Sequence, residues 1–175
     1  MQAIEQKNCP IAAMSSTAFT GLSSADLGTL TSAAVQGITG EQIDTLETPE
    51  EITALGTDVA NLNTAALASL TSEQVAALTT EQIAALGSED VAALASTALQ
   101  GLSSAQVAAL STAAFGALGT DDLGALTSAA VAGITAEQVA TLETTEEVTA
   151  LGTDIANLGT AAMGALTSEQ VAAME

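Results

Sequence analysis

The sequence predicts an all-α fold, a solenoid of very short helices with one helix in each eight-residue repeat. Three observations support this prediction: a strict period of eight, two large aliphatic residues in each period, and hydroxyl and acidic residues between them. From residue 70 the chain reads LTSEQVAA, LTTEQIAA, LGSEDVAA, LASTALQG and LSSAQVAA. Each octad has a large apolar residue at position 1, usually Ser or Thr at position 3, and a second large apolar residue at position 6.

The octad phase extends over nearly the whole chain. It begins at Gln6 and ends at Ala173, which makes 168 positions, or 21 octads. We therefore expect residues 1–175 to form one octapeptide-repeat solenoid, with repeats over 6–173 and no second domain.

One irregularity occurs twice. The unit 46–54 has nine residues and the unit 55–61 has seven, so that the phase is restored. The same pair recurs at 142–150 and 151–157, and Leu46 and Leu142 are 96 residues apart. A 96-residue super-repeat is therefore superimposed on the octad.

The octad does not fit one continuous helix. Eight residues at about 100° each would shift the apolar pair by about 80° around the axis in every repeat. Position 6 nevertheless lies three residues before the next position 1, as in Val75 and Leu78, and this is the spacing of neighbours on a helix. Each octad is thus expected to form a helix of one to one and a half turns followed by a corner.

Position 3 is interpreted as the N-cap of each helix. In the sequence Thr48-Pro49-Glu50-Glu51, the proline marks the first helical position, so that Thr48 is the expected cap. The hydroxyls at position 3 of the other octads are assigned as caps by analogy with Thr48. Acidic residues after the cap favour the positive end of the helix dipole.

Stacking of the octads follows from the shortness of the helices. A helix of about one turn is unstable alone because nucleation is costly, so leucine and valine must be buried between neighbouring octads. A β-solenoid is the alternative fold, although apolar spacings of three and five break the alternation of a strand. A largely disordered low-complexity chain is a further alternative, although disorder requires no apolar phase.

Composition excludes several classes of partner. The chain has 21 acidic residues, one basic residue (Lys7), no His, Trp or Tyr, and a net charge of −20. Binding of nucleic acid is not expected, because neutralising phosphates requires Lys and Arg and stacking bases requires aromatic rings. Membrane insertion is not expected either, because no apolar run approaches the roughly 18–20 residues of a spanning helix.

The same composition argues against catalysis. Without His or Arg, the groups left for chemistry are carboxylates, hydroxyls and the thiol of Cys9. We therefore expect no enzyme, and we assign no catalytic, cofactor-binding or metal-ligating residue and no cofactor. Cys9 fits an ordinary first-turn position or an intermolecular disulfide. Phe19 and Phe115, which lie 96 residues apart, are expected to fill the core.

Adjacent acidic residues have two interpretations. They could act as acid–base pairs or calcium ligands, but neighbours on a helix diverge by about 100° and calcium requires six to eight converging oxygens. First-turn carboxylates, about one per octad, explain them better, and we expect only diffuse binding of Ca²⁺ or other cations. The pairs are Glu50/Glu51, Glu89/Asp90, Asp121/Asp122 and Glu146/Glu147. The hydroxyl ladder resembles the rows of ice-binding solenoids, but capping is the favoured explanation.

Runs such as LTSEQVAALTTEQIAAL, residues 70–86, resemble the short Leu/Thr/Gln/Ala-rich repeats of large secreted bacterial surface proteins, the adhesins, haemagglutinins and RTX-like proteins. The resemblance covers 6–174 and transfers no binding residue. It implies an extracellular or cell-surface stalk, although the first residues, MQAIEQKNCPIAAMSS, lack the features of a cleavable signal peptide, so export would use another signal.

Two functions are compatible with these features. The first is a structural, non-enzymatic spacer, or a filament unit whose open ends associate end to end. The alternative is a binding solenoid that holds calcium, ice or a protein ligand on its acidic, hydroxyl-rich outer face.

Overall fold

The computed structural model describes residues 11–174, and within this range every regular element is a helix of three to six residues. The prediction of an all-α solenoid of short helices is confirmed. The alternative of a β-solenoid is wrong, because no strand occurs between residues 11 and 174. Cys9 and Lys7 lie outside the described residues.

Three octads make one coil of the solenoid. Each helix contacts the helix three octads further along the chain, so that the helices form three stacks that run side by side through the molecule. A 3₁₀ turn, η1 (Ile11–Ala13), precedes them. The first stack contains α3 (Ser32–Gln36), η2 (Gly56–Asn61), α8 (Thr80–Ala85), α11 (Ser104–Ala109), α14 (Ser128–Val131) and η3 (Gly152–Asn157).

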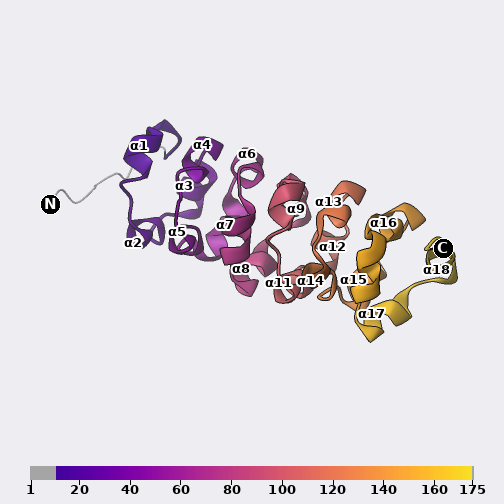
Figure 1. Ribbon diagram of the computed structural model, residues 1–175. Coiled ribbons are helices and arrows are strands. Elements are labelled where there is room, and N and C mark those ends of the chain that lie inside the picture. The colour runs from indigo at the N-terminus through magenta and orange to yellow at the C-terminus, as the bar shows by residue number, and fades with distance from the viewer. Residues whose placement is uncertain (1–10, 175) are drawn as a thin grey trace.

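The other two stacks have the same construction. The second stack contains α1 (Ser16–Phe19), α4 (Gly40–Ile43), α6 (Thr64–Ala68), α9 (Ser88–Ala93), α12 (Thr112–Phe115), α15 (Ala136–Val139) and α17 (Thr160–Ala165). The third stack contains α2 (Ser24–Leu27), α5 (Pro49–Thr53), α7 (Ser72–Ala77), α10 (Ser96–Leu99), α13 (Thr120–Ala125), α16 (Thr145–Ala150) and α18 (Ser168–Ala172). Figure 1 shows the result, an elongated rod with the first helices at one end and the last at the other.

The core lies along the axis of the rod. Positions 1 and 6 are buried in the middle coils; for example, Leu78 is 3% exposed and Ile83 is 0% exposed. Phe19 and Phe115 occupy position 6 and are 1% and 0% exposed, as expected for core fillers. Position 5 is a third inward position that the apolar pattern does not reveal, because it holds Ala in some octads and Gln in others.

The irregular units change the local helix type without interrupting a stack. After the nine-residue unit the chain passes through a glycine with positive φ, Gly56 at 56° and Gly152 at 53°, and enters the 3₁₀ helices η2 and η3. Glycine suits these two points because it adopts the left-handed region without a steric penalty. Both 3₁₀ helices belong to the first stack, because 96 residues correspond to four complete coils of 24.

Glycine also permits close contact between coils. A Cβ atom on Gly101 would lie 1.9 Å from the carbonyl oxygen of Ser72, and one on Gly133 would lie 2.0 Å from that of Ser104. These backbone atoms cannot move aside without disturbing the helices that carry them. None of the helices in the described part of the chain has the length and apolar character needed to cross a bilayer.

We predict that Gly101→Ala destabilises the solenoid by about 1–3 kcal/mol, because the methyl group would overpack a backbone contact. Gly164→Ala is the matched control, since no atom lies within 4 Å of a Cβ atom placed there. Alanine inside a helix is favoured over glycine, so the control should be neutral or stabilising. Urea unfolding followed by far-ultraviolet circular dichroism measures both, and equal midpoints for the two variants would contradict the contact.

Candidate functional site

The corner between two octads is the structural unit from which every functional feature of this chain is built. A corner contains the end of one helix, the N-cap of the next and the backbone carbonyls between them. We therefore describe first the caps, then the amides that hold the corners, and then the carboxylates on the outer surface.

The N-cap of a regular octad is position 2, and the assignment of position 3 is wrong. In α8, the Gln82 amide N–H donates to the Thr79 hydroxyl at 3.2 Å, and Thr80 is already the first helical residue. The caps of this kind that accept from the helix are Ser15, Ser23, Thr31, Thr39, Asn63, Thr71, Thr79, Ser103, Ser111, Thr127, Thr135 and Thr167.

Thr48 is a cap, as predicted, but it is a poor guide to the other octads. Its nine-residue unit contains an additional residue, Glu47, between the leading leucine and the cap, which moves the cap from position 2 to position 3. The hydroxyls at position 3 of regular octads are therefore not occupied by capping. Three of them donate to a carboxylate in the next coil: Ser32 to Asp58 at 2.8 Å, Ser96 to Asp122 at 2.7 Å and Ser128 to Asp154 at 2.6 Å.

Buried glutamines at position 5 join one coil to the preceding one, and sequence reasoning missed them. Gln106 is 3% exposed. Its Oε1 atom accepts from the amide and the hydroxyl of Ser103, both at 2.8 Å, which caps its own helix. Its Nε2 atom donates to the carbonyls of Val75 at 2.9 Å and Leu78 at 2.7 Å, which lie at the corner below. One side chain thus caps a helix and satisfies two buried carbonyls of another coil.

The same clamp recurs along the rod. Gln42, Gln74 and Gln138 also donate to two carbonyls, 31 and 28 residues earlier. Gln170 donates to Leu142, and Gln82 donates to Thr53 and Gly56 across the irregular unit. The spacing of 32 residues between Gln42, Gln74, Gln106, Gln138 and Gln170 is the sequence signal that could have revealed them.

The acidic pairs lie in the first turns of helices, as expected. In each pair the second carboxylate accepts from the amide of its own N-cap, as Glu51 does from Thr48 at 2.8 Å and Asp90 from Gly87 at 2.8 Å. Asp122 and Glu147 bind Gly119 and Thr144 in the same way. The structure therefore uses one member of each pair for capping, and within the described residues no three Asp, Glu, His or Cys side chains gather as metal ligands.

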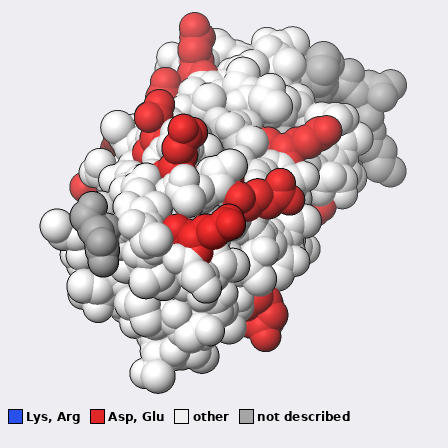
Figure 2. Space-filling view, turned by 90° about the vertical axis from the view of Figure 1, so that its right-hand side faces the viewer, with Lys and Arg blue, Asp and Glu red and all other residues white. Residues whose placement is uncertain are grey.

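The carboxylates are distributed unevenly among the stacks, which corrects the expectation of about one per octad. Of the 19 in residues 11–174, three belong to the first stack, namely Asp58, Glu81 and Asp154. Eleven belong to the third stack, namely Asp26, Glu47, Glu50, Glu51, Glu73, Asp121, Asp122, Glu143, Glu146, Glu147 and Glu169. Figure 2, viewed from the C-terminal side of the rod, shows carboxylates on the outer surface with uncharged areas between them.

Asp26 is the carboxylate with a clear electrostatic perturbation. The Ser23 hydroxyl donates to its Oδ2 atom at 2.7 Å and the Ser23 amide at 3.0 Å. Both hydrogen bonds favour the charged form and lower the pKa of Asp26 below its usual value, the hydroxyl contributing most. The perturbation follows from helix capping and involves no second titratable group.

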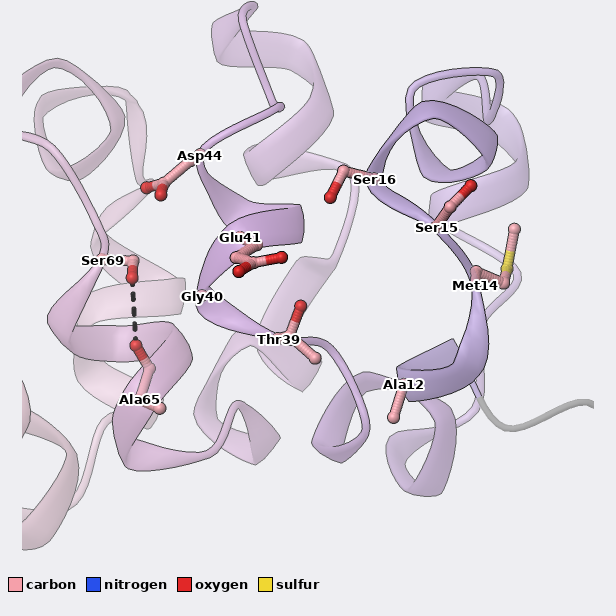
Figure 3. Close-up of a pocket in the computed structure, with 10 residues that line it drawn as sticks. All are labelled: Ala12, Met14, Ser15, Ser16, Thr39, Gly40, Glu41, Asp44, Ala65 and Ser69. Atoms are coloured by element: carbon pink, nitrogen blue, oxygen red, sulfur yellow. Dashed lines mark hydrogen bonds between the residues drawn. The ribbon is translucent and has the colours of Figure 1, made fainter.

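A shallow groove of about 690 Å³ opens between α1, α4 and α6 (Figure 3). Gly40 makes room for Ser69, whose hydroxyl donates to the carbonyl of Ala65 at 3.2 Å. The charged groups in the lining are the exposed carboxylates of Glu41 and Asp44. The groove therefore offers small polar groups and two carboxylates, and the lining has no buried ionisable group.

We predict that Thr79→Ala lowers the free energy of unfolding by about 1 kcal/mol, because it removes the hydroxyl that caps α8. Thr80→Ala changes the neighbouring hydroxyl and should have little effect, because that side chain is exposed and caps nothing. Chemical denaturation of the two variants distinguishes position 2 from position 3. A larger loss for Thr80→Ala would restore the original assignment.

We also predict that Gln106→Ala destabilises the rod by about 2–4 kcal/mol, since the carbonyls of Val75 and Leu78 lose their donor in a buried corner. Gln100→Ala, at an exposed position after α10, serves as the control. Hydrogen exchange of the amides around residues 75–79 should accelerate in the first variant only. Unchanged exchange there would show that the clamp contributes nothing to holding the two coils together.

Comparison with family models agrees with the repeated architecture. A model described as the ALTTAQ repeat matches residues 52–88, 83–120 and 115–153, which together span more than half of the chain. The three matches begin 31 and 32 residues apart, close to the spacing of the glutamine clamps. No curated protein matches the chain. The matching repeats, together with the regular array of capped corners, show that the chain belongs to the ALTTAQ repeat family.

Proposed function

We propose that this protein is a structural, non-enzymatic spacer, a rod whose length is its functional property. The observation that carries the proposal is the continuity of the three stacks. Each set of three octads adds one coil, and the core of each coil packs directly on the next. A molecule built in this way holds whatever lies at its two ends at a defined separation.

The contacts between coils suit a rod that resists bending. Glutamine clamps and buried aliphatic side chains connect successive coils on all three stacks, because the clamps at Gln42, Gln74 and Gln106 belong to the second, third and first stacks in turn. Buried polar networks of this kind add directional constraints that hydrophobic contacts lack. A spacer benefits from such constraints because a flexible chain of the same length would collapse toward a coil.

The proposed location is extracellular or on a bacterial cell surface, as part of a larger adhesive or secreted assembly. The support is the resemblance of runs such as 70–86 to the repeat arrays of large secreted bacterial surface proteins. A net charge of −20 would keep neighbouring rods apart and would attract a diffuse layer of Ca²⁺ and other cations. End-to-end self-association is part of the same proposal.

The spacer proposal predicts that the rod lengthens in proportion to the number of coils. A second copy of residues 46–141, inserted before Leu142, adds 96 residues and recreates neighbour pairs similar to those already present. With helices packed at about 8–10 Å, four added coils should extend the rod by about 32–40 Å at constant cross-section. Small-angle X-ray scattering at low concentration measures both dimensions.

The control is an insertion of equal length composed of Gly and Ser at the same point. It should produce a flexible profile and no added helix signal in circular dichroism. A thicker or globular particle from the super-repeat insertion would overturn the proposal that length is the property this fold provides.

A further inference from the structure

We propose that the two ends of the rod bind each other, so that a second copy of this chain docks head to tail and continues all three stacks. The inference rests on the proposed spacer function and specifies its partner. The surface at issue is the C-terminal coil, formed by η3, α17 and α18, and its occupant is the first coil of another copy, formed by α1 and α2.

The C-terminal coil exposes the side chains that are buried elsewhere. Val171, at position 6 of its octad, is 49% exposed, whereas Val107 and Val139 at the same position in middle coils are 0% exposed. Met174, which begins the next octad, is 37% exposed. Val171 and Met174 are the exposed large hydrophobic residues of the described part of the chain, and both lie at this end.

The opposite end exposes a different octad position. Leu22 and Leu30, at position 1, are only half-buried, whereas Leu102 and Leu118 at position 1 in middle coils are 3% exposed. Position 6 is fully covered at this end, as shown by Leu27 at 1% exposure.

Position 1 therefore faces the preceding coil, and position 6 faces the following one. The octad that contains α17 shows the same polarity, because Leu158 at position 1 is 8% exposed while Met163 at position 6 is half-buried. The two ends consequently present the two complementary halves of the contact that joins every pair of coils inside the rod.

The internal contacts determine the register of docking. Helices pack on the helix of the same stack one coil away, as α15 does on α17 and α16 does on α18. In the assembly, α1 of the second copy would therefore lie on α17 in the second stack, and α2 would lie on α18 in the third. Such an interface joins unlike surfaces and does not close on itself, so it generates an open filament.

Electrostatics opposes this association and makes it dependent on salt. Residues 11–174 contain no Lys, Arg or His, so no ion pair between side chains of this range can form across the junction. Like charges on the two copies repel over a Debye length of about 10 Å at 0.1 M salt. We therefore expect assembly to strengthen as the ionic strength increases.

Sedimentation velocity of the full chain over a range of protein and salt concentrations tests the proposal. Species larger than a dimer should form with increasing concentration, and Val171→Asp should weaken assembly by about tenfold or more, because it places a charge in the apolar junction. Ala172→Asp carries the same charge on the same helix, at octad position 7, which remains exposed even in middle coils, as at Ala108 and Ala140. It should assemble nearly as the parent does.

A mixing experiment tests the polarity. Leu22→Asp blocks the N-terminal face and Val171→Asp blocks the C-terminal face, so each variant alone should remain monomeric while the mixture forms a one-to-one dimer. Circular dichroism verifies that both variants retain the parent helix content. If the parent stops at a dimer or remains monomeric at every concentration, if the two α18 variants weaken assembly equally, or if the mixture forms no dimer, the proposal is overturned. Scattering from the monomer would still test the spacer function.

Discussion

The packing of one coil on the next is the interaction on which the rest of this structure depends. Each helix has only three to six residues and could not persist alone in water, because nucleation costs more than so short a helix recovers. Burial of positions 1 and 6 between coils supplies the missing stabilisation, and the capped corner directs the chain into the next helix. Both halves of this contact are exposed where the described coils end, which is why the same interaction suggests how two copies would join.

Two periods coexist in the chain, and their mismatch explains its longer repeat. The coil takes 24 residues, whereas the glutamine clamps recur every 32. Each clamp therefore belongs to the stack after the one that carried the previous clamp, so the amide bonds wind around the rod. The two periods coincide after 96 residues, the distance between the two irregular units and between Gly56 and Gly152. The super-repeat is thus the shortest segment after which both sequence and coil return to the same face.

The uneven placement of carboxylates gives the rod sides of different character. The third stack carries most of the charge, and the first stack presents mainly hydroxyl and alanine side chains. Many carboxylates have a structural role, because at Glu51, Asp90, Asp122 and Glu147 they close a capping box on their own helix. Charge in this protein therefore serves helix termini first, and the long-range repulsion between rods is a consequence of that local role.

The octad pattern by itself determined the fold class, the inward placement of positions 1 and 6 and the first-turn position of the acidic pairs, because these follow from local helix geometry and burial. It did not determine the cap position: the inference from Thr48 was displaced by one residue, since the nine-residue unit holds the additional Glu47. Only the tertiary structure decided that three octads make a coil and that Gln106 and its equivalents clamp carbonyls about 30 residues away. Those contacts join segments distant in sequence, so their formation depends on how the corners bend in three dimensions.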